Sequence, residues 1–421
     1  MEQIRSDKFS PEEVVGLLRS LVSVKSPYFH EDDIMEFVNG WLADNGLPAR
    51  IHEYYEEKET HFNGKNVIGE IDGGHPGPVI YLNCHLDTVN LCEGWTLPPY
   101  EGVVRDGYMY GVGALDMKAG CCCTMLALAA FYREFGDSFR GRIIYNFVSD
   151  EEGPYGLGTT AIILDNISNI AGGMQTSGVR GAYQNGGADF AIITEPSAGF
   201  TGGAHPCLAL GAKGGYNYRI RLRGRSAHAA TPELGINALT EAGKVMTEIE
   251  NMAVVTDKKL GSSTPCVINL IMNGNACSVP DDVAVEVFHH TVRGETPEKI
   301  RAGIEKAVRK AGIRCSYEIS FRQSPAEGFD GGFMPYCTDE NDPYVQTLSQ
   351  AIAEVCGRKP SYTYFQSIGD FNHIGGKLGI PTVLFGPDGD NFHSYDERVR
   401  IKSVCEIAES IFEFLKKTNK M

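Results

Sequence analysis

Histidine, aspartate and glutamate residues stand at five places along the chain where the sequence pattern predicts the end of a strand or the start of a helix. In an open α/β sheet, ligands bind outside the carboxyl ends of the strands. Imidazole nitrogens and carboxylate oxygens are ligands that zinc accepts, and no set of cysteine thiolates competes with them. The residues concerned are His85, Asp87, Asp116, Asp150, Glu151, Glu152, Glu195 and His393.

The first place is His85-Leu86-Asp87, directly after an apolar run at 79–84 that predicts a buried strand. His85 can bind a metal ion while Asp87 accepts a hydrogen bond from the other ring nitrogen. On this segment alone a second interpretation stays open, because a hydrogen-bonded pair at a strand end needs no metal.

Three adjacent acids, Asp150, Glu151 and Glu152, follow another predicted strand at 142–148. A cation would relieve their mutual repulsion at the end of a buried strand. Two neighbouring glutamates also suit two roles, since one can bind a metal while the other takes a proton from water. The alternative is a solvated acidic loop without a ligand.

The other places carry one candidate each. Asp116 lies in a glycine-rich segment just before a predicted helix, where it is equally suited to cap the helix N-terminus. Glu195 follows a predicted strand at 190–193, and His393 follows one at 382–385. A lone glutamate or histidine in such a place is more often structural than functional. The hypothesis of a metal site therefore depends on the coincidence of all five places.

Strands alternate with helices in the first and last parts of the chain, which predicts an α/β domain with a mostly parallel mixed sheet between helices. The middle part has the order β-α-β-β-α-β of a ferredoxin-like α+β domain. We expect a catalytic domain from residues 1–209 and 323–421, and an inserted domain at 210–322. The expected elements include helices at 10–23, 118–131 and 342–356 in the catalytic domain, and segments 216–222, 236–251, 266–272, 283–289, 298–311 and 316–321 in the inserted domain.

The composition is that of a globular chain, with 421 residues of which 42% are hydrophobic. A net charge of -16 argues against nucleic acid or an anionic membrane surface as a partner. We identify no apolar run of about 18 residues that would span a membrane, and no signal peptide in the polar N-terminus. The 12 cysteines form no CxxC pair, which predicts reduced thiols and a cytoplasmic location.

Taken in order over nearly the whole chain, these motifs resemble those of the metallopeptidase family of acetylornithine deacetylase, succinyl-diaminopimelate desuccinylase and glutamate carboxypeptidase. Each motif alone is modest, but their order and spacing together are highly specific. The matching segments are His85-x-Asp87, Gly111-x-Gly113-x-x-Asp116-Met117-Lys118, Asp150-Glu151-Glu152, Glu195-Pro196, Gly224-Arg225-Ser226-Ala227-His228, Gly379-Ile380-Pro381-Thr382, Phe385-Gly386-Pro387 and His393-x-x-Asp396-Glu397.

The resemblance implies a hydrolase that cleaves the amide bond of an N-acyl amino acid or short peptide with water activated by two divalent ions. The ions would be zinc, with cobalt or manganese as other candidates. Asp116 would bridge the two ions. His85 and Glu195 would complete one site. Glu152 and His393 would complete the other.

The resemblance also assigns roles to residues that do not bind metal. Glu151 would be the general base, and Asp87 would orient His85. The inserted domain would act as a dimerisation or lid domain, so a homodimer is expected. His228 of that domain would reach the active site of a partner subunit and hydrogen-bond the oxyanion. The alternative for His228 is an exposed loop histidine without a catalytic role.

The chain departs from the family pattern at His290, which stands where relatives carry an arginine that clamps a substrate carboxylate. The resemblance therefore does not identify the substrate, because histidine cannot copy that bidentate contact. An aminopeptidase or dipeptidase with the same catalytic domain is a rival interpretation. A non-catalytic metal-binding protein is another, although such a protein would not need Glu151. The glycine-rich stretch 171–188 is expected to form a loop near the site rim.

Overall fold

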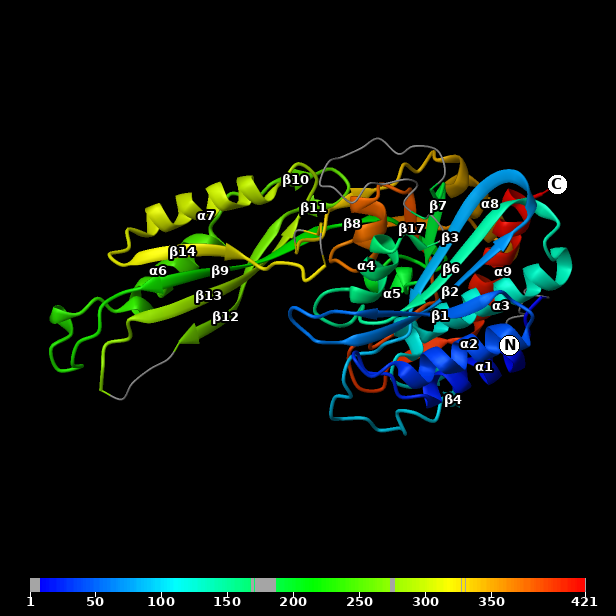
Figure 1. Cartoon of the computed structure of the whole chain (residues 1–421), viewed down its shortest axis with the longest axis horizontal. Helices are drawn as coiled ribbons and strands as arrows, with labels where there is room; N and C mark the ends of the chain where they lie inside the picture. The colour runs from blue at the N-terminus through cyan, green and yellow to red at the C-terminus, as the bar shows by residue number, and fades with distance from the viewer. Residues whose placement is uncertain are drawn as a thin grey trace.

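The computed structural model of the chain describes residues 8–167, 170, 187–272, 277–326, 328–329 and 331–420. Figure 1 shows a larger part built around a nine-stranded sheet and a smaller part that extends to one side of it. Both described ends of the chain lie in the larger part, which is therefore assembled from the beginning and the end of the sequence. This arrangement confirms the predicted fold class. Almost all of the glycine-rich stretch lies outside the described residues.

The large sheet is mixed and has a parallel centre. Its strands are β1 (Ala49–Tyr55), β2 (Asn63–Asp72), β3 (Gly74–His85), β6 (Phe139–Val148), β7 (Phe190–Ile193), β8 (Cys207–Ala212), β15 (Tyr336–Cys337), β16 (Ser361–Phe365) and β17 (Thr382–Leu384). They follow the order β1-β2-β6-β3-β7-β17-β8-β15, with β16 paired to β8. The run from β6 to β17 is parallel, so the carboxyl ends of these four strands meet at one edge.

Helices cover both faces of this sheet, which explains why its parallel strands are continuous apolar runs rather than alternating ones. The core on one face includes residues of α1 (Pro11–Ser23), α2 (Asp32–Asp44), α3 (Ala119–Phe135), α8 (Pro343–Cys356) and α9 (Ile401–Thr418). The core on the other face includes α4 (Leu157–Leu164) and the turn His373–Lys377. Both layers stabilise the sheet edge that carries the predicted site.

Helix α3 and the turn before it form the segment Ala114–Phe135, which is long and apolar enough to cross a membrane by length and composition. By these criteria the expectation that the chain contains no apolar run of membrane-spanning length is wrong. Its most apolar window is entirely buried inside the structure. The core helix of a folded domain meets the same criteria, so the segment is weak evidence for a membrane span. The three consecutive cysteines of this helix are buried, and all 12 cysteines of the chain are free.

The smaller part is the inserted domain. It contains β9 (Gly214–Arg223), α6 (Ala238–Glu250), β12 (Thr264–Met272), β13 (Asp282–Thr291), α7 (Pro297–Ala311) and β14 (Ser316–Phe321). The strands form an antiparallel sheet in the order β12-β13-β9-β14. A small hairpin of β10 (Thr256–Asp257) and β11 (Gly261–Ser262) is added before β12. The order of its main elements is the predicted β-α-β-β-α-β. Strand β8 of the large sheet ends at Ala212, three residues beyond the domain boundary expected at residue 209.

A third, small sheet joins two segments that are far apart in the sequence. Its strands are β4 (Val103–Arg105), β5 (Tyr108–Tyr110), β18 (Gly389–Asp390) and β19 (Arg398–Arg400), in the order β18-β19-β5-β4. Strand β5 ends just before the glycine-rich segment that carries Asp116, and the loop between β18 and β19 carries His393. The pairing of β5 with β19 therefore brings these two predicted ligands toward each other.

Candidate metal centre

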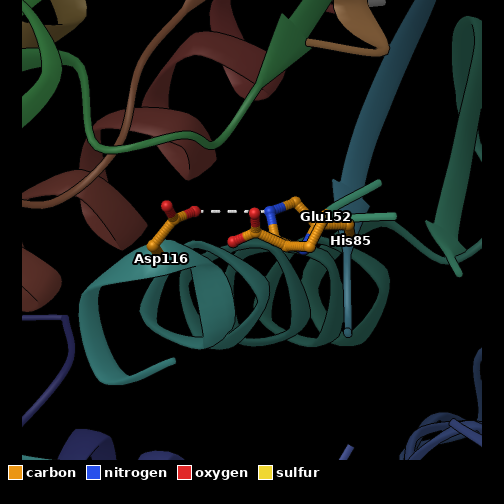
Figure 2. A group of neighbouring side chains, drawn as sticks. All are labelled: His85, Asp116 and Glu152. Atoms are coloured by element: carbon orange, nitrogen blue, oxygen red, sulfur yellow. Dashed lines mark ion pairs between the residues drawn. The ribbon is translucent and has the colours of Figure 1, made fainter. Parts of the chain in front are cut away.

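His85 is the last residue of β3 and is buried. Its Nε2 atom lies 3.3 Å from Oδ1 of Asp116 and 3.4 Å from Oε1 of Glu195. Figure 2 shows the pair of His85 and Asp116 beside Glu152, with Asp116 in the turn that directly precedes helix α3. Glu195 follows β7, which runs parallel to β3 as its direct neighbour. The parallel register thus delivers a histidine and a glutamate to the same strand edge.

His393 approaches the same aspartate from the other side. Its Nε2 atom lies 2.8 Å from Oε1 of Glu152 and 3.2 Å from Oδ2 of Asp116. The two carboxylate oxygens of Asp116 therefore face two different histidines. A carboxylate in this position can contact two cations at once.

Glu151 lies beside this cluster. Its Oε2 atom is 3.9 Å from Nε2 of His85, and its Oε1 atom accepts a hydrogen bond of 3.1 Å from the backbone N–H of Asp370. Possible ligand atoms of His85, Glu151 and Glu195 all lie within 4.8 Å of one another, as do those of His85, Asp116 and Glu152. The structure thus gathers the five predicted ligands and the predicted general base in one place.

Asp87 holds the acidic loop as well as facing the histidine. Its carboxylate accepts hydrogen bonds from the backbone N–H of Glu151 at 3.2 Å and of Glu152 at 2.8 Å. Oδ1 of Asp87 lies 3.5 Å from Nδ1 of His85, while its backbone oxygen is closer, at 3.0 Å. Asp87 therefore contacts three of the gathered residues, and its contacts with the two glutamates were not predicted.

Glu397 is a buried residue to which the sequence analysis gave no role. Its carboxylate accepts hydrogen bonds of 2.8–2.9 Å from the backbone N–H groups of Gly113, Leu115 and Asp116. These contacts fix the turn that presents Asp116, next to a cis peptide bond between Asp116 and Met117. Glu397 ended a motif of the family resemblance, but a motif does not reveal which amides a carboxylate meets.

Asp150, the first of the three adjacent acids, makes its contacts away from the ligand cluster. Its N–H donates to Oε1 of Glu31 at 3.1 Å, and its Oδ2 accepts a hydrogen bond of 3.2 Å from the N–H of Leu157. Burial, followed by the charge of Asp87, raises the pKa of Asp150 to about 8, so its carboxyl is largely neutral at pH 7. Protonation of this residue therefore relieves part of the repulsion that the sequence predicts.

The pKa values of the clustered groups show the cost of gathering acids without a cation. Burial, and then the nearby Asp116, raises the pKa of Glu152 to about 7. Burial also raises the pKa of Glu195 to about 8. Hydrogen bonds to Asp116 and Glu152 raise the pKa of His393 to about 11. The protein alone thus retains protons that a divalent cation would displace.

Two buried atoms of the cluster test whether metal ions fit this site. Among the described residues, Nε2 of His85 and Oε2 of Glu195 are buried and have no hydrogen-bond partner. Buried polar atoms are nearly always satisfied, so such atoms indicate a missing partner. The donor set is nitrogen and carboxylate oxygen, as zinc and similar divalent ions require. The residues therefore fit a pair of divalent cations.

Two predicted histidines lie outside this cluster. His228 is exposed and follows β9, whose ten residues span roughly 30 Å away from the large sheet. Its Nδ1 accepts a hydrogen bond of 3.0 Å from the N–H of Ala230. His290, on β13, has its Nε2 atom 3.2 Å from the hydroxyl of Ser367, and burial lowers its pKa to about 4. The His290 ring is therefore neutral at pH 7.

Comparison with known proteins points to one family. A sequence model of peptidase family M20/M25/M40 matches residues 81–417. The succinyl-diaminopimelate desuccinylase of Hydrogenovibrio crunogenus is 26% identical over 377 residues, covering 87% of this chain and 92% of that protein. A tripeptidase from Staphylococcus aureus has a similar structure, with a TM-score of 0.71 at 20% identity over 98% of this chain and 99% of that one. A dinuclear metal-binding peptidase of the M20 family from Bacillus subtilis gives a TM-score of 0.67 at 13% identity over 96% of both chains.

Proposed function

This chain belongs to peptidase family M20/M25/M40, and from that premise we propose that it cleaves the amide bond of an N-acyl amino acid or a short peptide. Membership of the family makes it a metallohydrolase. Relatives named as a desuccinylase and as a tripeptidase support an acylated amino acid or a short peptide as the substrate class. The observation that carries the proposal is the placement of Asp116 between two histidines, with Glu151 beside them.

The proposed centre holds two divalent ions. Zinc is the first candidate because the ligands are imidazole and carboxylate groups, which also accept cobalt and manganese. When bound, the two ions lower the pKa of water and polarise the scissile carbonyl group. The proposed ligands are His85, Asp116 and Glu195 for one ion, and Asp116, Glu152 and His393 for the other.

Glu151 is the proposed general base. Its carboxylate takes a proton from the attacking water and later gives that proton to the leaving nitrogen. The N–H of Asp370 fixes one of its oxygens, so the other is directed at the cluster. Burial raises the pKa of Glu151 well above its usual value. Nearby cations oppose that shift because positive charge favours the ionised carboxylate.

The proposed active site also needs the inserted domain of a second chain. Strand β9 carries the chain roughly 30 Å away from the large sheet before it reaches His228, so we infer that His228 does not serve the cluster of its own chain. Strand β12 is an edge strand whose Ile268 and Ile271 are 53% and 40% exposed. Exposed apolar edge strands pair readily with another chain. These features support a homodimer in which the partner subunit's His228 hydrogen-bonds the oxyanion.

The substitution Glu151→Gln tests the proposal. We expect turnover to fall by roughly 10²–10⁴-fold, because the glutamine cannot accept the proton from water. Metal content should stay close to that of the wild type, since Glu151 is not one of the proposed ligands. Both quantities can be measured on the same purified protein, by initial rates and by elemental analysis. The matched control is Glu57→Gln, which changes an exposed glutamate outside the site.

A substrate panel separates the proposal from its rivals. The panel contains N-acetyl amino acids, N-succinyl amino acids, dipeptides and tripeptides, each with and without a chelator. Cleavage of acylated amino acids that the chelator abolishes supports the deacylase. Cleavage of peptides alone would identify an aminopeptidase or dipeptidase. Bound metal without any cleavage would overturn the hydrolase proposal in favour of a binding protein.

A further inference from the structure

Four phenylalanine rings form a continuous row that starts beside His393. The ring centroid of Phe392 lies 5.7 Å from that of His393 and 5.0 Å from that of Phe200. Phe200 lies 4.8 Å from Phe365, with the two planes 21° apart. Phe365 in turn lies 5.8 Å from Phe371. We call these four residues the aromatic row.

The aromatic row is tied to the proposed metal ligands at more than one point. Phe392 directly precedes His393, whose ring it contacts edge to face. Phe200 lies on the short helix α5 (Ser197–Thr201), which follows Glu195 after a single proline. A group attached to an amide at the cluster therefore comes within reach of Phe392 and Phe200.

Exposure decreases along the aromatic row. Phe392 is 38% exposed, Phe200 and Phe365 are half-buried, and Phe371 is 1% exposed. The row thus offers an accessible aromatic surface at one end and is anchored in the core at the other. Ligand sites in proteins typically combine such an apolar lining with a few placed polar groups. Here the polar groups are those of the neighbouring cluster.

The inserted domain places the rings of Phe288 and His290 near the same row. His290 is neutral at pH 7, packs edge to face on Phe288 at 4.7 Å, and contacts Ser367. Ser367 lies two residues after Phe365 in the chain. Because the His290 ring itself carries no charge, an apolar group can pack on it without desolvating a charged imidazole. The nearby charge of Lys213, which also lowers the pKa of His290, is held by a hydrogen bond of 2.7 Å to the backbone oxygen of Ser262.

We propose that the aromatic row is the specificity surface for an apolar, preferably aromatic, group next to the scissile amide of the substrate. The proposal rests on the proposed hydrolase function and narrows its substrate class. Aromatic groups pack on one another with centroids about 4.5–7 Å apart, as the rings of the row already do. A substrate ring added at the exposed end would continue that packing and bury Phe392.

The test compares substrates that differ only in one ring. N-acetylphenylalanine and N-benzoylalanine place the ring on either side of the amide, and N-acetylalanine lacks it. We expect the wild type to prefer at least one ring-bearing substrate in kcat/KM. Phe392→Ala should reduce that preference roughly tenfold, and Phe392→Leu should reduce it less. The ratio is the readout, because a general disturbance of His393 would lower all the rates together.

The control variant is Tyr55→Ala, which removes an aromatic side chain that is 57% exposed on β1, away from the row. It should leave every substrate ratio unchanged. An unchanged ratio in Phe392→Ala would overturn the proposal. If that variant instead altered the oligomeric mass in light scattering, with the ratio unchanged, the row would be a contact between copies of the chain and the proposal would also be wrong.

A binding measurement separates this proposal from the hydrolase proposal. Calorimetry on metal-loaded Glu151→Gln compares the affinity for N-acetylphenylalanine, N-benzoylalanine and N-acetylalanine, with and without Phe392→Ala. A ring preference that Phe392→Ala abolishes supports the aromatic row even if the wild type cleaves none of these compounds. Hydrolysis by the wild type without any ring preference in binding or rate would sink the aromatic row alone.

Discussion

The proposed metal cluster and the sheet of the inserted domain both gather acidic side chains, but these side chains are neutralised differently in the two regions. In the inserted domain, Asp282 pairs with Arg221 and Glu286 pairs with Arg219, each on the neighbouring strand. In the proposed metal cluster, the described ion pairs of the proposed ligands are made with histidines. Arginines therefore neutralise these two acids of the inserted domain, whereas the proposed ligands face histidines and one another, as expected if added cations neutralise them.

The two regions also differ in whether the residues of a single chain are enough to assemble them. Segments of one chain bring the proposed ligands and Glu151 together around a single sheet edge. His228, in contrast, is exposed and lies in the segment that follows β9 of the inserted domain. One chain can therefore form the proposed metal centre but not the whole proposed active site. We therefore expect substitutions in the proposed metal cluster to change metal binding, and substitutions in the inserted domain to leave metal binding intact.

The largest effect expected in the inserted domain is that of His228→Ala. Removing one donor to an oxyanion typically costs roughly 10²–10³-fold in kcat. Metal content should not change, because His228 contacts none of the proposed ligands in its own chain. Initial rates and elemental analysis measure both quantities. The matched control is His75→Ala, which changes an exposed histidine in the first half of β3. A loss of metal in His228→Ala would contradict the separation of the two regions.

Mixed dimers sharpen this prediction. Glu151→Gln and His228→Ala are each expected to be nearly inactive, but a dimer with one subunit of each kind contains one intact site. Random assembly of equal amounts should restore about a quarter of wild-type activity, because half of the dimers are mixed and each has one working site of two. No recovery after proven subunit exchange would show that His228 does not act across the dimer.

The fold could be predicted where local signals are strong. The helix expected at 10–23 is α1, which begins after Ser10, whose hydroxyl accepts a hydrogen bond of 3.1 Å from the N–H of Glu13. The strand expected at 142–148 is the buried part of β6. Strands β1 and β2 were missed because they are partly exposed and polar, so neither a continuous apolar run nor a clean alternation marks them.

That the proposed ligands lie together was predictable from the sequence, but the contacts that support them were not. Chemistry and spacing single out His85, Asp116 and Glu152, and parallel strands place such residues at one edge. No local pattern reveals that Glu397 binds three backbone amides of the Asp116 turn, or that Asp150 turns toward Glu31. These contacts join segments far apart in the chain, and only tertiary packing decides them.

Glu397→Gln tests the hydrogen bonds that hold the turn carrying Asp116, and its effect should be smaller than that of His228→Ala. The glutamine places an N–H₂ group among three N–H donors, so the turn that carries Asp116 must move. Loss of such a supporting contact typically weakens metal binding roughly 10–100-fold. Competition with a chelator measures the dissociation constant. The control is Asp396→Asn, which changes the adjacent carboxylate that holds Thr96 at the surface and should affect metal binding much less.

The smallest expected effect is a pH dependence of opposite sign in the two regions of the metal-free protein. The pKa values of Glu152 and Glu195 are raised to about 7 and about 8, so their folded forms retain protons that the unfolded chain has lost. Their contribution to stability is complete below pH 4.5 and disappears as the pH rises through 7 to 8. Hydrogen bonds to Arg221 and Arg219 lower the pKa values of Asp282 and Glu286. Their contribution is present above the ordinary pKa values and disappears as the pH falls through the lowered ones.

Hydrogen exchange resolved by peptide, corrected for intrinsic rates, can follow both regions in one sample. From pH 5.5 to pH 8, protection around β3 and β7 should fall in the metal-free protein, with a loss in Tm of roughly 2–4 °C, while the inserted domain should change little. Below pH 4, protection should instead fall in the inserted domain and change little around β3 and β7. Metal binding should remove the pH dependence of protection around β3 and β7. It should also release about two protons per chain at pH 7, which calorimetry in buffers of different ionisation enthalpy can measure. Protection around β3 that increases with pH in the metal-free protein would mean that the clustered carboxylates are already neutralised by the protein, and the need for cations would disappear with it.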